Sequence, residues 1–258
     1  MERVLRDSDI TLASRFECKY VISPLLVPAI REFVAPFARP DRFAAARSDR
    51  RYPICSLYLD SDDLLLYQQT VGGEKNRFKL RVRSYTDDET APLFFEVKRK
   101  INNIVQKRRA RVERTEAQAL LDGRRGASPD SELEYFASHL GLVSARPVIR
   151  VRYMREAYES TAGDPVRITL DSELMHVATF GADLRHDHGR WVATPVEGVI
   201  LELKFTEVFP AWVRDMVQVF GLKQQPVPKY VLCVDHMLLV GRESVLSVGG
   251  LTLPVRRS

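Results

Sequence analysis

The most constraining feature of this chain is a run of three strand patterns, from Phe78 to Arg111, in which charged and apolar residues alternate. Successive side chains of a strand point to opposite faces, so each pattern places its charged residues on one face. A half-buried sheet ordinarily turns such a face to water. That interpretation does not explain why basic residues recur on one strand after another. The charged residues that share a face in these three patterns are Lys79, Arg81, Arg83, Glu96, Lys98, Lys107, Arg109 and Arg111.

Two further segments repeat the combination of a carboxylate and an ammonium group two residues apart. Glu17 precedes Lys19 near the start of the chain, and Glu202 precedes Lys204 near its end. If all these strands curl into one sheet with the charged face inward, the interior is lined by Lys and Arg with a few Glu. Unpaired buried charges are too costly for a dry core, so such an interior must hold water, ions or a polyanion. A few carboxylates among many cations suit a phosphate site that uses a divalent metal.

Length and composition allow one large domain. With 258 residues, of which 45% are hydrophobic, the chain can bury a sizeable core. We expect a single domain over residues 1–258, with a core from about residue 12 to about residue 240 and a flexible arm and tail at the two ends. Most of the 39 basic residues are arginine, which binds phosphate oxygens in a bidentate manner. A GC-rich genome would produce the same bias, so both explanations remain open.

The sequence carries no sign of a membrane span or a disulfide framework. No stretch approaches the roughly 20 apolar residues that cross a bilayer. The three cysteines, Cys18, Cys55 and Cys233, are scattered and form no CxxC pair. We therefore expect a reducing compartment, the cytoplasm.

Helix signals separate the expected strands. Ser23 and Pro24 supply an N-cap and a proline at the first helical position, and Pro36 ends the helix. Pro210 opens an amphipathic helix that ends at Gly221. We expect further short helices at residues 115–122 and 128–141, strands at 12–22, 52–59, 147–158 and 166–171, a polar hairpin at 177–192 and an extended segment at 226–230.

Two other motifs could bind a metal, but each has a simpler explanation. The acidic stretch at residues 60–63 contains a D-x-D pair, yet it precedes an apolar run and suits helix capping. His186 and His188 have H-x-H spacing, yet they lie in a turn-like stretch with no third ligand nearby. Neither GxGxxG nor a P-loop occurs, so side chains rather than a glycine cradle would hold any nucleotide.

Eight segments in order resemble the VTC domain, the polyphosphate polymerase module of the vacuolar transporter chaperone complex, which has bacterial relatives. That domain belongs to the triphosphate tunnel metalloenzymes, together with CYTH-type phosphatases and RNA triphosphatases. No single segment is diagnostic, but eight in the right order make a strong signal. The segments are RFECKY at 15–20, SLYLD at 56–60, KLRVR at 79–83, FEVK at 95–98, YMREA at 153–157, RITLD at 167–171, LELK at 201–204 and VPKY at 227–230.

The resemblance implies an α+β fold, an antiparallel β-barrel that forms a tunnel, with peripheral helices. It also implies an enzyme, a phosphotransferase that passes the γ-phosphate of ATP to a growing polyphosphate chain with Mn²⁺ or Mg²⁺. The residue pattern as interpreted here does not single out Arg155 among Arg150, Arg152 and Arg155, or choose between Lys107 and Arg109; the resemblance selects Arg155 and Lys107. The implied catalytic residues are Lys19, Arg81, Arg83, Lys98, Arg155 and Arg167; the phosphate-binding residues are Lys107, Lys229 and, from the strand pattern, Lys204; the metal ligand is Glu202, with Glu17 and Glu96 as secondary candidates.

The sequence departs from the family pattern at one position, and three functions are compatible with it. Family members typically carry a second Lys three residues after that of the Pro-Lys-Tyr segment, and here that position is Leu232. The alternatives to a polymerase are a hydrolase of tripolyphosphate or nucleoside triphosphates and a non-catalytic polyphosphate-binding module. Arg15 occupies the position at which CYTH-type enzymes usually carry their first glutamate, which favours the VTC branch.

The expected partners are ATP and polyphosphate. Nucleic acid is disfavoured, because the basic strands lack interleaved exposed aromatic residues. Polymerases of this kind often act beside a membrane protein that moves the product, so association with a membrane through such a partner is a further expectation.

Overall fold

The structure is a computed structural model that describes residues 16–102, 104–122, 124, 130–163, 165–206 and 209–248. The expected N-terminal arm, the first residues of the expected strand at 12–22 and the C-terminal tail lie outside these residues. Among the described residues, no helix is long and apolar enough to cross a membrane. The cytoplasmic location and the membrane-protein partner stay predictions.

The core of the fold is one antiparallel sheet of ten strands, in the order β1-β10-β8-β7-β3-β4-β5-β6, with β2 added to β7 and β9 to β8. This confirms the α+β class and the antiparallel arrangement. Within the described residues β1 and β6 are the two ends of this path, and no strand ladder closes it into a barrel. The strands are β1 Phe16–Ile22, β2 Ala38–Pro40, β3 Tyr52–Asp60, β4 Asn76–Ser84, β5 Leu93–Ile101, β6 Ile104–Val112, β7 Arg146–Ser160, β8 Val166–Ala178, β9 Val192–Ala193 and β10 Val199–Phe205.

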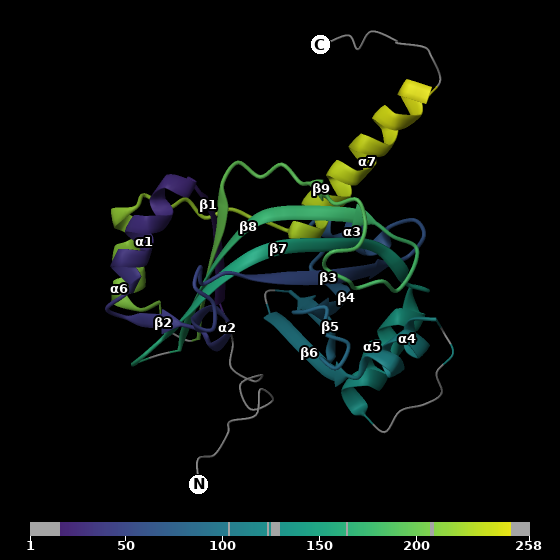
Figure 1. The fold of residues 1–258 in the computed structure, drawn as a ribbon, viewed down its shortest axis with the longest axis horizontal. Coiled ribbons are helices and arrows are strands. Elements are labelled where there is room, and N and C mark those ends of the chain that lie inside the picture. The colour runs from purple at the N-terminus through teal and green to yellow at the C-terminus, as the bar shows by residue number, and fades with distance from the viewer. Residues whose placement is uncertain are drawn as a thin grey trace.

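Although its ladder is open, the sheet is strongly curled. The Nζ atom of Lys98 on β5 lies 3.1 Å from Oε2 of Glu17 on β1. In the sheet order, β10, β8, β7, β3 and β4 lie between β1 and β5. A flat sheet could therefore not bring these two side chains together. Figure 1 shows the long strands β7 and β8 arching over β4, β5 and β6.

Seven helices of the described chain surround the sheet, and two of the expected cap signals are confirmed. Ser23 accepts a hydrogen bond from the Leu25 amide at the start of a short 3₁₀ turn, Pro24–Leu26, that leads into α1. The carboxylate of Asp60 accepts hydrogen bonds from the first amides of α3, so the acidic stretch caps a helix. The helices are α1 Val27–Val34, α2 Arg42–Ala45, α3 Leu65–Val71, α4 Arg114–Leu121, α5 Ser131–Leu142, α6 Ala211–Val219 and α7 Lys229–Val248.

Two expectations for local structure are wrong. The polar hairpin at 177–192 is instead a long loop, because β8 continues to Ala178 and only β9 returns to pair with it. The extended segment at 226–230 ends at Pro228, since Lys229 begins α7. Proline is well tolerated immediately before a helix, and the apolar residues that follow Lys229 pack against the sheet. Apolar periodicity there is weak, which is why the sequence did not reveal α7.

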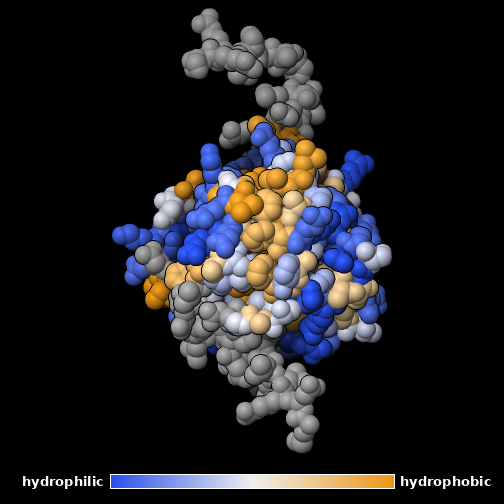
Figure 2. All heavy atoms as spheres, turned by 90° about the vertical axis from the view of Figure 1, so that its left-hand side faces the viewer, coloured by the Kyte–Doolittle hydropathy of each residue, from blue (hydrophilic) through white to orange (hydrophobic). Residues whose placement is uncertain are grey.

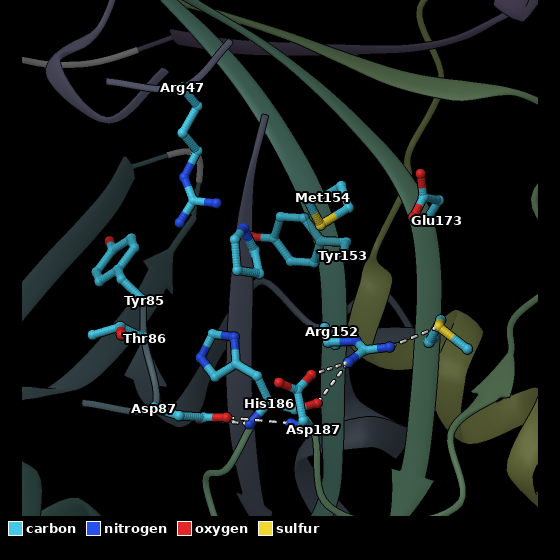
Figure 3. Close-up of a pocket in the computed structure, with 12 residues that line it drawn as sticks. Arg47, Tyr85, Thr86, Asp87, Arg152, Tyr153, Met154, Glu173, His186 and Asp187 are labelled. Carbon is cyan, nitrogen blue, oxygen red and sulfur yellow. Dashed lines mark hydrogen bonds and ion pairs between the residues drawn. The ribbon is translucent and has the colours of Figure 1, made fainter. Parts of the chain in front are cut away.

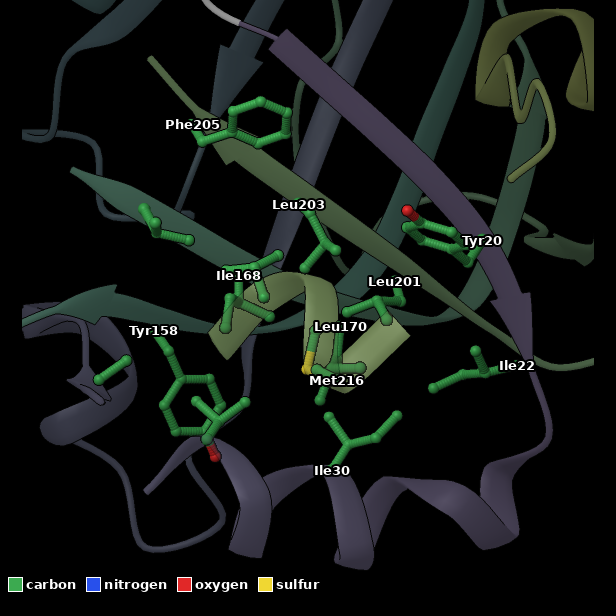
Figure 4. Packing of buried hydrophobic residues seen from close by; sticks show 14 of the residues in the cluster. Tyr20, Ile22, Ile30, Tyr158, Ile168, Leu170, Leu201, Leu203, Phe205 and Met216 are labelled. Atoms are coloured by element: carbon green, nitrogen blue, oxygen red, sulfur yellow. The ribbon is translucent and has the colours of Figure 1, made fainter. Parts of the chain in front are cut away.

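Three apolar cores determine which face of the sheet is covered. Helices α1 and α6 pack on β1, β8 and β10 through residues such as Ile30, Met216 and Leu203 (Figure 4). Helices α4 and α5 cover β4, β5 and β6, where the rings of Phe95 and Phe136 lie 4.9 Å apart. Burial of these apolar faces leaves the opposite face of the same strands to the charged residues.

The third core lies on that opposite face. Tyr230 of α7 stacks on Tyr58 of β3, with ring centroids 4.8 Å apart, and Cys233 and Val234 pack beside it. Tyr58 is the direct partner of Arg81 in the β3–β4 ladder, so α7 packs against the face that carries the charges. Helix α7 therefore brings its first residue, Lys229, to that face.

The side of the molecule that carries α1 and α6 exposes a band of apolar side chains bordered by hydrophilic ones (Figure 2). Exposed apolar residues on or next to these helices include Leu25, Phe37 and Val219. The stacked rings of Phe37 and Trp212, 4.9 Å apart, join the chain after α1 to α6. The band is thus the outer edge of the first core, on the opposite side of the strands from the charged face.

Candidate functional site

The predicted site residues of the strands all lie on one face of the sheet, which we call the charged face. Residues that are direct partners in a ladder point to the same side. The ladders pair Glu17 with Lys204, Lys19 with Glu202 and Arg81 with Glu96. The charged face comprises Glu17, Lys19, Lys79, Arg81, Arg83, Glu96, Lys98, Lys107, Arg109, Arg155, Arg167, Asp171, Glu202 and Lys204.

Glu202 is the centre of a first cluster. Its side chain is buried, and its carboxylate oxygens lie 2.7 Å from Lys229, 2.9 Å from Lys204, 3.6 Å from Lys19 and 3.7 Å from Arg155. Burial alone would raise the pKa of Glu202, but these four cations hold it well below its usual range. The carboxylate is therefore ionised and surrounded by positive charge. We call these five residues the Glu202 cluster.

Asp171 supports two members of this cluster. Its carboxylate accepts two hydrogen bonds from the Arg155 guanidinium, at 2.6 and 2.7 Å, and lies 2.7 Å from the Lys229 ammonium. A positive charge at a helix N-terminus is unfavourable, so Lys229 depends on the carboxylates of Asp171 and Glu202. Burial opposes the charge on Lys229, but these two carboxylates raise its pKa. Both cations are thus fixed in position before any ligand binds.

Glu96 is the centre of a second cluster. Its carboxylate is fully buried and lies 2.6 Å from Arg81, 2.7 Å from Lys107, 3.2 Å from Arg109 and 3.7 Å from Arg83. Burial would raise the pKa of Glu96, but the surrounding cations hold it well below its usual range. Both residues that alternation left undecided, Lys107 and Arg109, contact the same carboxylate. We call these five residues the Glu96 cluster.

Glu17 connects the two clusters. Its carboxylate oxygens lie 2.9 Å from Lys19 and 3.1 Å from Lys98. Lys19 also contacts Glu202, whereas Lys98 lies on β5 next to the Glu96 cluster. Burial would raise the pKa of Glu17, but Lys204, Lys98 and Lys19 lower it strongly. One continuous charged surface thus runs from β1 and β10 to β5 and β6.

Tyr85 is a member of the site that the sequence did not single out. It is the next alternate position after Arg83, and its hydroxyl oxygen lies 2.9 Å from an Arg109 guanidinium nitrogen and 3.5 Å from one of Arg83. Burial would raise the pKa of Tyr85, but these two arginines lower it to about 7. The Tyr85 ring stacks on Phe43 of α2, with centroids 5.5 Å apart. The hydroxyl therefore faces two cations of the Glu96 cluster.

Lys79 also lies on the charged face, as alternation predicts, although it was not among the selected site residues. Its direct partner on β5 is Lys98. The side chain is half-buried, and the described chain offers it no carboxylate within ion-pair distance. Burial, with Lys19 and Lys98 nearby, lowers the pKa of Lys79 to about 7. Among the described residues, Lys79 is thus a cation without a counterion.

Arg167 occupies a more peripheral position than the other predicted residues. It is the ladder partner of Lys204, but its guanidinium lies 2.6 Å from Asp41 and also contacts Glu159. Tyr52 accepts a further weak hydrogen bond from it at 3.5 Å. None of these partners belongs to the Glu202 or Glu96 cluster. The structure therefore places Arg167 at the rim of the charged face.

The histidine pair does not form a metal site in the described structure. His186 contacts the Ser84 hydroxyl at 3.2 Å, whereas His188 contacts Asp183 at 2.6 Å. The described residues include no group of three or more His, Cys, Asp or Glu side chains arranged to hold a metal ion.

A separate cavity of about 490 Å³ lies beside the site (Figure 3). Its lining includes Arg152, Met175, His186 and Asp187, and Arg152 donates a hydrogen bond to the carbonyl of His186 at 2.6 Å. Its lining includes Tyr85 but no member of the Glu202 or Glu96 cluster. The charged face and this cavity are therefore different features.

Comparison with known proteins gives one family and a set of similar folds. The model of the VTC domain family matches residues 14–238. A solved structure from Bacillus halodurans, described as a candidate adenylate cyclase, is 13% identical, with a TM-score of 0.50 and coverage of 83% of this chain and 94% of that one. A candidate adenylyl cyclase from Hippeastrum, described as having a dominant triphosphatase activity, is 12% identical, with a TM-score of 0.47 and coverage of 95% and 100%.

Proposed function

Because this chain belongs to the VTC domain family, we propose that its charged face is a phosphoryl-transfer site. In this proposal the site transfers the γ-phosphate of ATP to the end of a growing polyphosphate chain. The reaction forms a bond between a terminal phosphate oxygen of the chain and the γ-phosphorus, and it breaks the bond between that phosphorus and the oxygen bridging to the β-phosphate. ADP leaves, and the chain is longer by one phosphate.

The excess of cations on the charged face is the observation that carries the proposal. The two clusters and their neighbours contain more than twice as many cations as carboxylates. Such an excess in a largely buried setting is costly unless an external polyanion compensates it. The cations are Lys19, Lys79, Arg81, Arg83, Lys98, Lys107, Arg109, Arg155, Lys204 and Lys229, and the carboxylates are Glu17, Glu96, Asp171 and Glu202.

The side chains of the site suit a reaction that depends on positioning and charge. Phosphoryl transfer requires the attacking and leaving oxygens in line and stabilisation of the charge on the transferred group. Asp171 orients Arg155, and Glu96 orients Arg81, before any substrate binds. Preorganised cations of this kind stabilise the transition state without reorganising. A terminal phosphate oxygen is already ionised at neutral pH, so the site needs no histidine base.

The carboxylates fit the divalent ion that the family implies. Glu17 and Glu202 lie on neighbouring strands of the same face, and both contact Lys19. Mg²⁺ and Mn²⁺ prefer oxygen ligands and are commonly held by one or two carboxylates together with substrate phosphates. We propose that Glu202 and Glu17 hold the ion, which would neutralise charge on the phosphate oxygens. Glu96, which four cations enclose, acts in this proposal as their counterion.

Hydrolysis of tripolyphosphate or nucleoside triphosphates is the second candidate. Leu232 lies one turn after Lys229 on α7, at a position where the resemblance leads us to expect a lysine. Without a cation at this position, the site would bind a polyphosphate chain more weakly. Water would then replace the end of the chain as the nucleophile. The same cations would serve either reaction.

The test is to incubate the purified protein with ATP and Mn²⁺ at low salt, with and without a short polyphosphate primer. Both long polyphosphate and free phosphate are measured. The proposal expects long polymer, formed sooner when the primer is present. Free phosphate without polymer would assign the protein to the hydrolases. If neither product forms but the protein binds polyphosphate tightly, the protein is a binding module.

A further inference from the structure

Three lysines form a row across the charged face. Lys79 on β4 is the direct partner of Lys98 on β5, which is in turn the direct partner of Lys107 on β6. Like charges directly opposite each other on neighbouring strands are destabilising. The row is therefore unfavourable unless negative charge is placed against it.

Carboxylates of the described residues supply that negative charge for only two of the three lysines. Lys98 lies 3.1 Å from Glu17, and Lys107 lies 2.7 Å from Glu96. Within the described chain no carboxylate reaches Lys79. The charged groups of the described chain that act most strongly on Lys79 are cations: Arg77 and Arg81 on its own strand, Lys98 on β5 and Lys19 on β1.

The row extends the Glu96 cluster in one direction. Arg81, Glu96 and Arg109 form one rung across β4, β5 and β6, and the lysine row is the next rung toward the turn between β5 and β6. Two residues of strand separate the rungs, which is about 7 Å. A linear phosphate chain held by the Glu96 cluster would meet Lys79 if it continued in this direction.

We propose that Lys79 is a further binding residue for linear condensed phosphate, and that its neutral amine takes up a proton, forming an ammonium group, when phosphate occupies this rung. The proposal rests on the proposed function, since it assumes that the charged face binds such a chain. Burial, together with the nearby cations, lowers the pKa of Lys79 to about 7 in the free protein, so much of this side chain is neutral above that pH. Phosphate oxygens beside it favour the charged form, and the proton comes from the buffer.

The test measures proton uptake by titration calorimetry with tripolyphosphate and with a longer polyphosphate, each in buffers of different ionisation enthalpy. The wild type is compared with Lys79→Arg, which keeps the charge but cannot titrate. We expect the wild type to take up more protons than Lys79→Arg at about pH 8, by up to about one per site, and the difference to vanish near pH 6. This comparison cancels proton release from the phosphate itself.

Lys79→Met tests the binding role. We expect it to weaken binding of the longer polyphosphate about tenfold, which corresponds to the loss of one charged contact, whereas Lys79→Arg keeps the affinity. Lys75→Met, which removes an exposed charge just before β4, is the matched control and should bind as the wild type does.

Equal proton uptake by the wild type and Lys79→Arg, or unchanged affinity in Lys79→Met, would overturn the inference. If the wild type lengthens polyphosphate but shows no uptake linked to Lys79, only the inference is wrong. If the linked uptake is present but ATP yields no polymer, the proposed function is wrong and the binding role of Lys79 stands.

Discussion

Lys98 and Glu17 form an ion pair of 3.1 Å between β5 and β1, two strands that lie near opposite ends of the sheet order. This ion pair can form only if the sheet curls until β1, the first strand in the sheet order, faces β5, the last but one. Glu17 also contacts Lys19, which contacts Glu202, so the Glu202 and Glu96 clusters belong to one surface. A single polyanion can therefore contact both clusters at once.

Glu96→Gln should destabilise the free protein and strengthen polyanion binding. The change removes the counterion of four cations, and loss of one partner from a buried ion pair costs about 3–5 kcal/mol. Thermal unfolding with and without tripolyphosphate measures the effect, and the ligand should restore much of the lost stability. Glu132→Gln is the matched control: Glu132 pairs with Arg108 at the surface, and its loss should cost less than about 1 kcal/mol. An equally stable Glu96→Gln protein would contradict the counterion role.

Glu202→Gln should abolish metal-dependent turnover while polyphosphate binding is retained or tightened. The substitution removes a carboxylate that we assign to the divalent ion, but it leaves Lys19, Lys204 and Lys229 free to bind phosphate. Turnover at saturating Mn²⁺ and polyphosphate affinity without metal are measured on the same preparation. Full turnover in this variant would show that Glu202 is not the metal ligand.

Arg155 and Arg167 should differ in their effect on catalysis. Arg155 is buried and held by Asp171 and Glu202, whereas Arg167 lies at the rim with Asp41. We expect Arg155→Lys, which loses the paired hydrogen bonds, to lower kcat by about 10²- to 10³-fold. Arg167→Lys should mainly raise KM, by less than about tenfold. Equal losses of kcat would contradict this division of roles.

Tyr85 should titrate near neutral pH in the free protein. Arg83 and Arg109 outweigh the effect of burial and lower its pKa to about 7, so ultraviolet absorbance should reveal one phenolate that forms near that pH. Tyr85→Phe should remove this transition, and Tyr20→Phe should leave it, because burial raises the pKa of Tyr20 to about 12. Tripolyphosphate should shift the transition upward, since it offsets the charge of the two arginines. No ligand effect would place the phosphate away from Tyr85.

The same pKa shift has a consequence for stability. A phenol whose pKa is lower in the folded than in the unfolded protein favours folding most above the unfolded value of about 10. This contribution decreases as the pH falls and is lost below about pH 7. Tyr85→Phe should therefore lose more stability, relative to the wild type, at alkaline than at acidic pH.

Alternation along the strands was enough to predict which residues share the charged face. Arg81, Glu96 and Lys107 were placed on one face because the side-chain period of a strand is two. The same period cannot tell Lys107 from Arg109, since both point the same way, and the structure brings both to Glu96. The face to which a side chain points follows from its position in the strand. The residue with which a charged side chain pairs depends on the register between neighbouring strands.

The position of Lys229, the role of Asp171 and the curl of the sheet depend on long-range packing, which the sequence pattern does not predict. Lys229 reaches Glu202 only because α7 packs on the charged face, and weak apolar periodicity concealed that helix. Asp171 ends a predicted strand segment, but its role follows from the two hydrogen bonds that it accepts from Arg155. In the part of the chain that the structure describes, β1 and β6 do not pair; whether they meet depends on how far the sheet curls, which no local sequence pattern specifies.

The central claim is tested most directly with ATP labelled at the γ-phosphate, supplied with Mn²⁺ and a short unlabelled polyphosphate primer. The products are separated by chain length, and the label is counted in each fraction. The account expects label in chains longer than the primer, at an amount equal to the ADP released. Label confined to free orthophosphate, with ADP formed at the same rate, would contradict chain elongation and identify water as the acceptor.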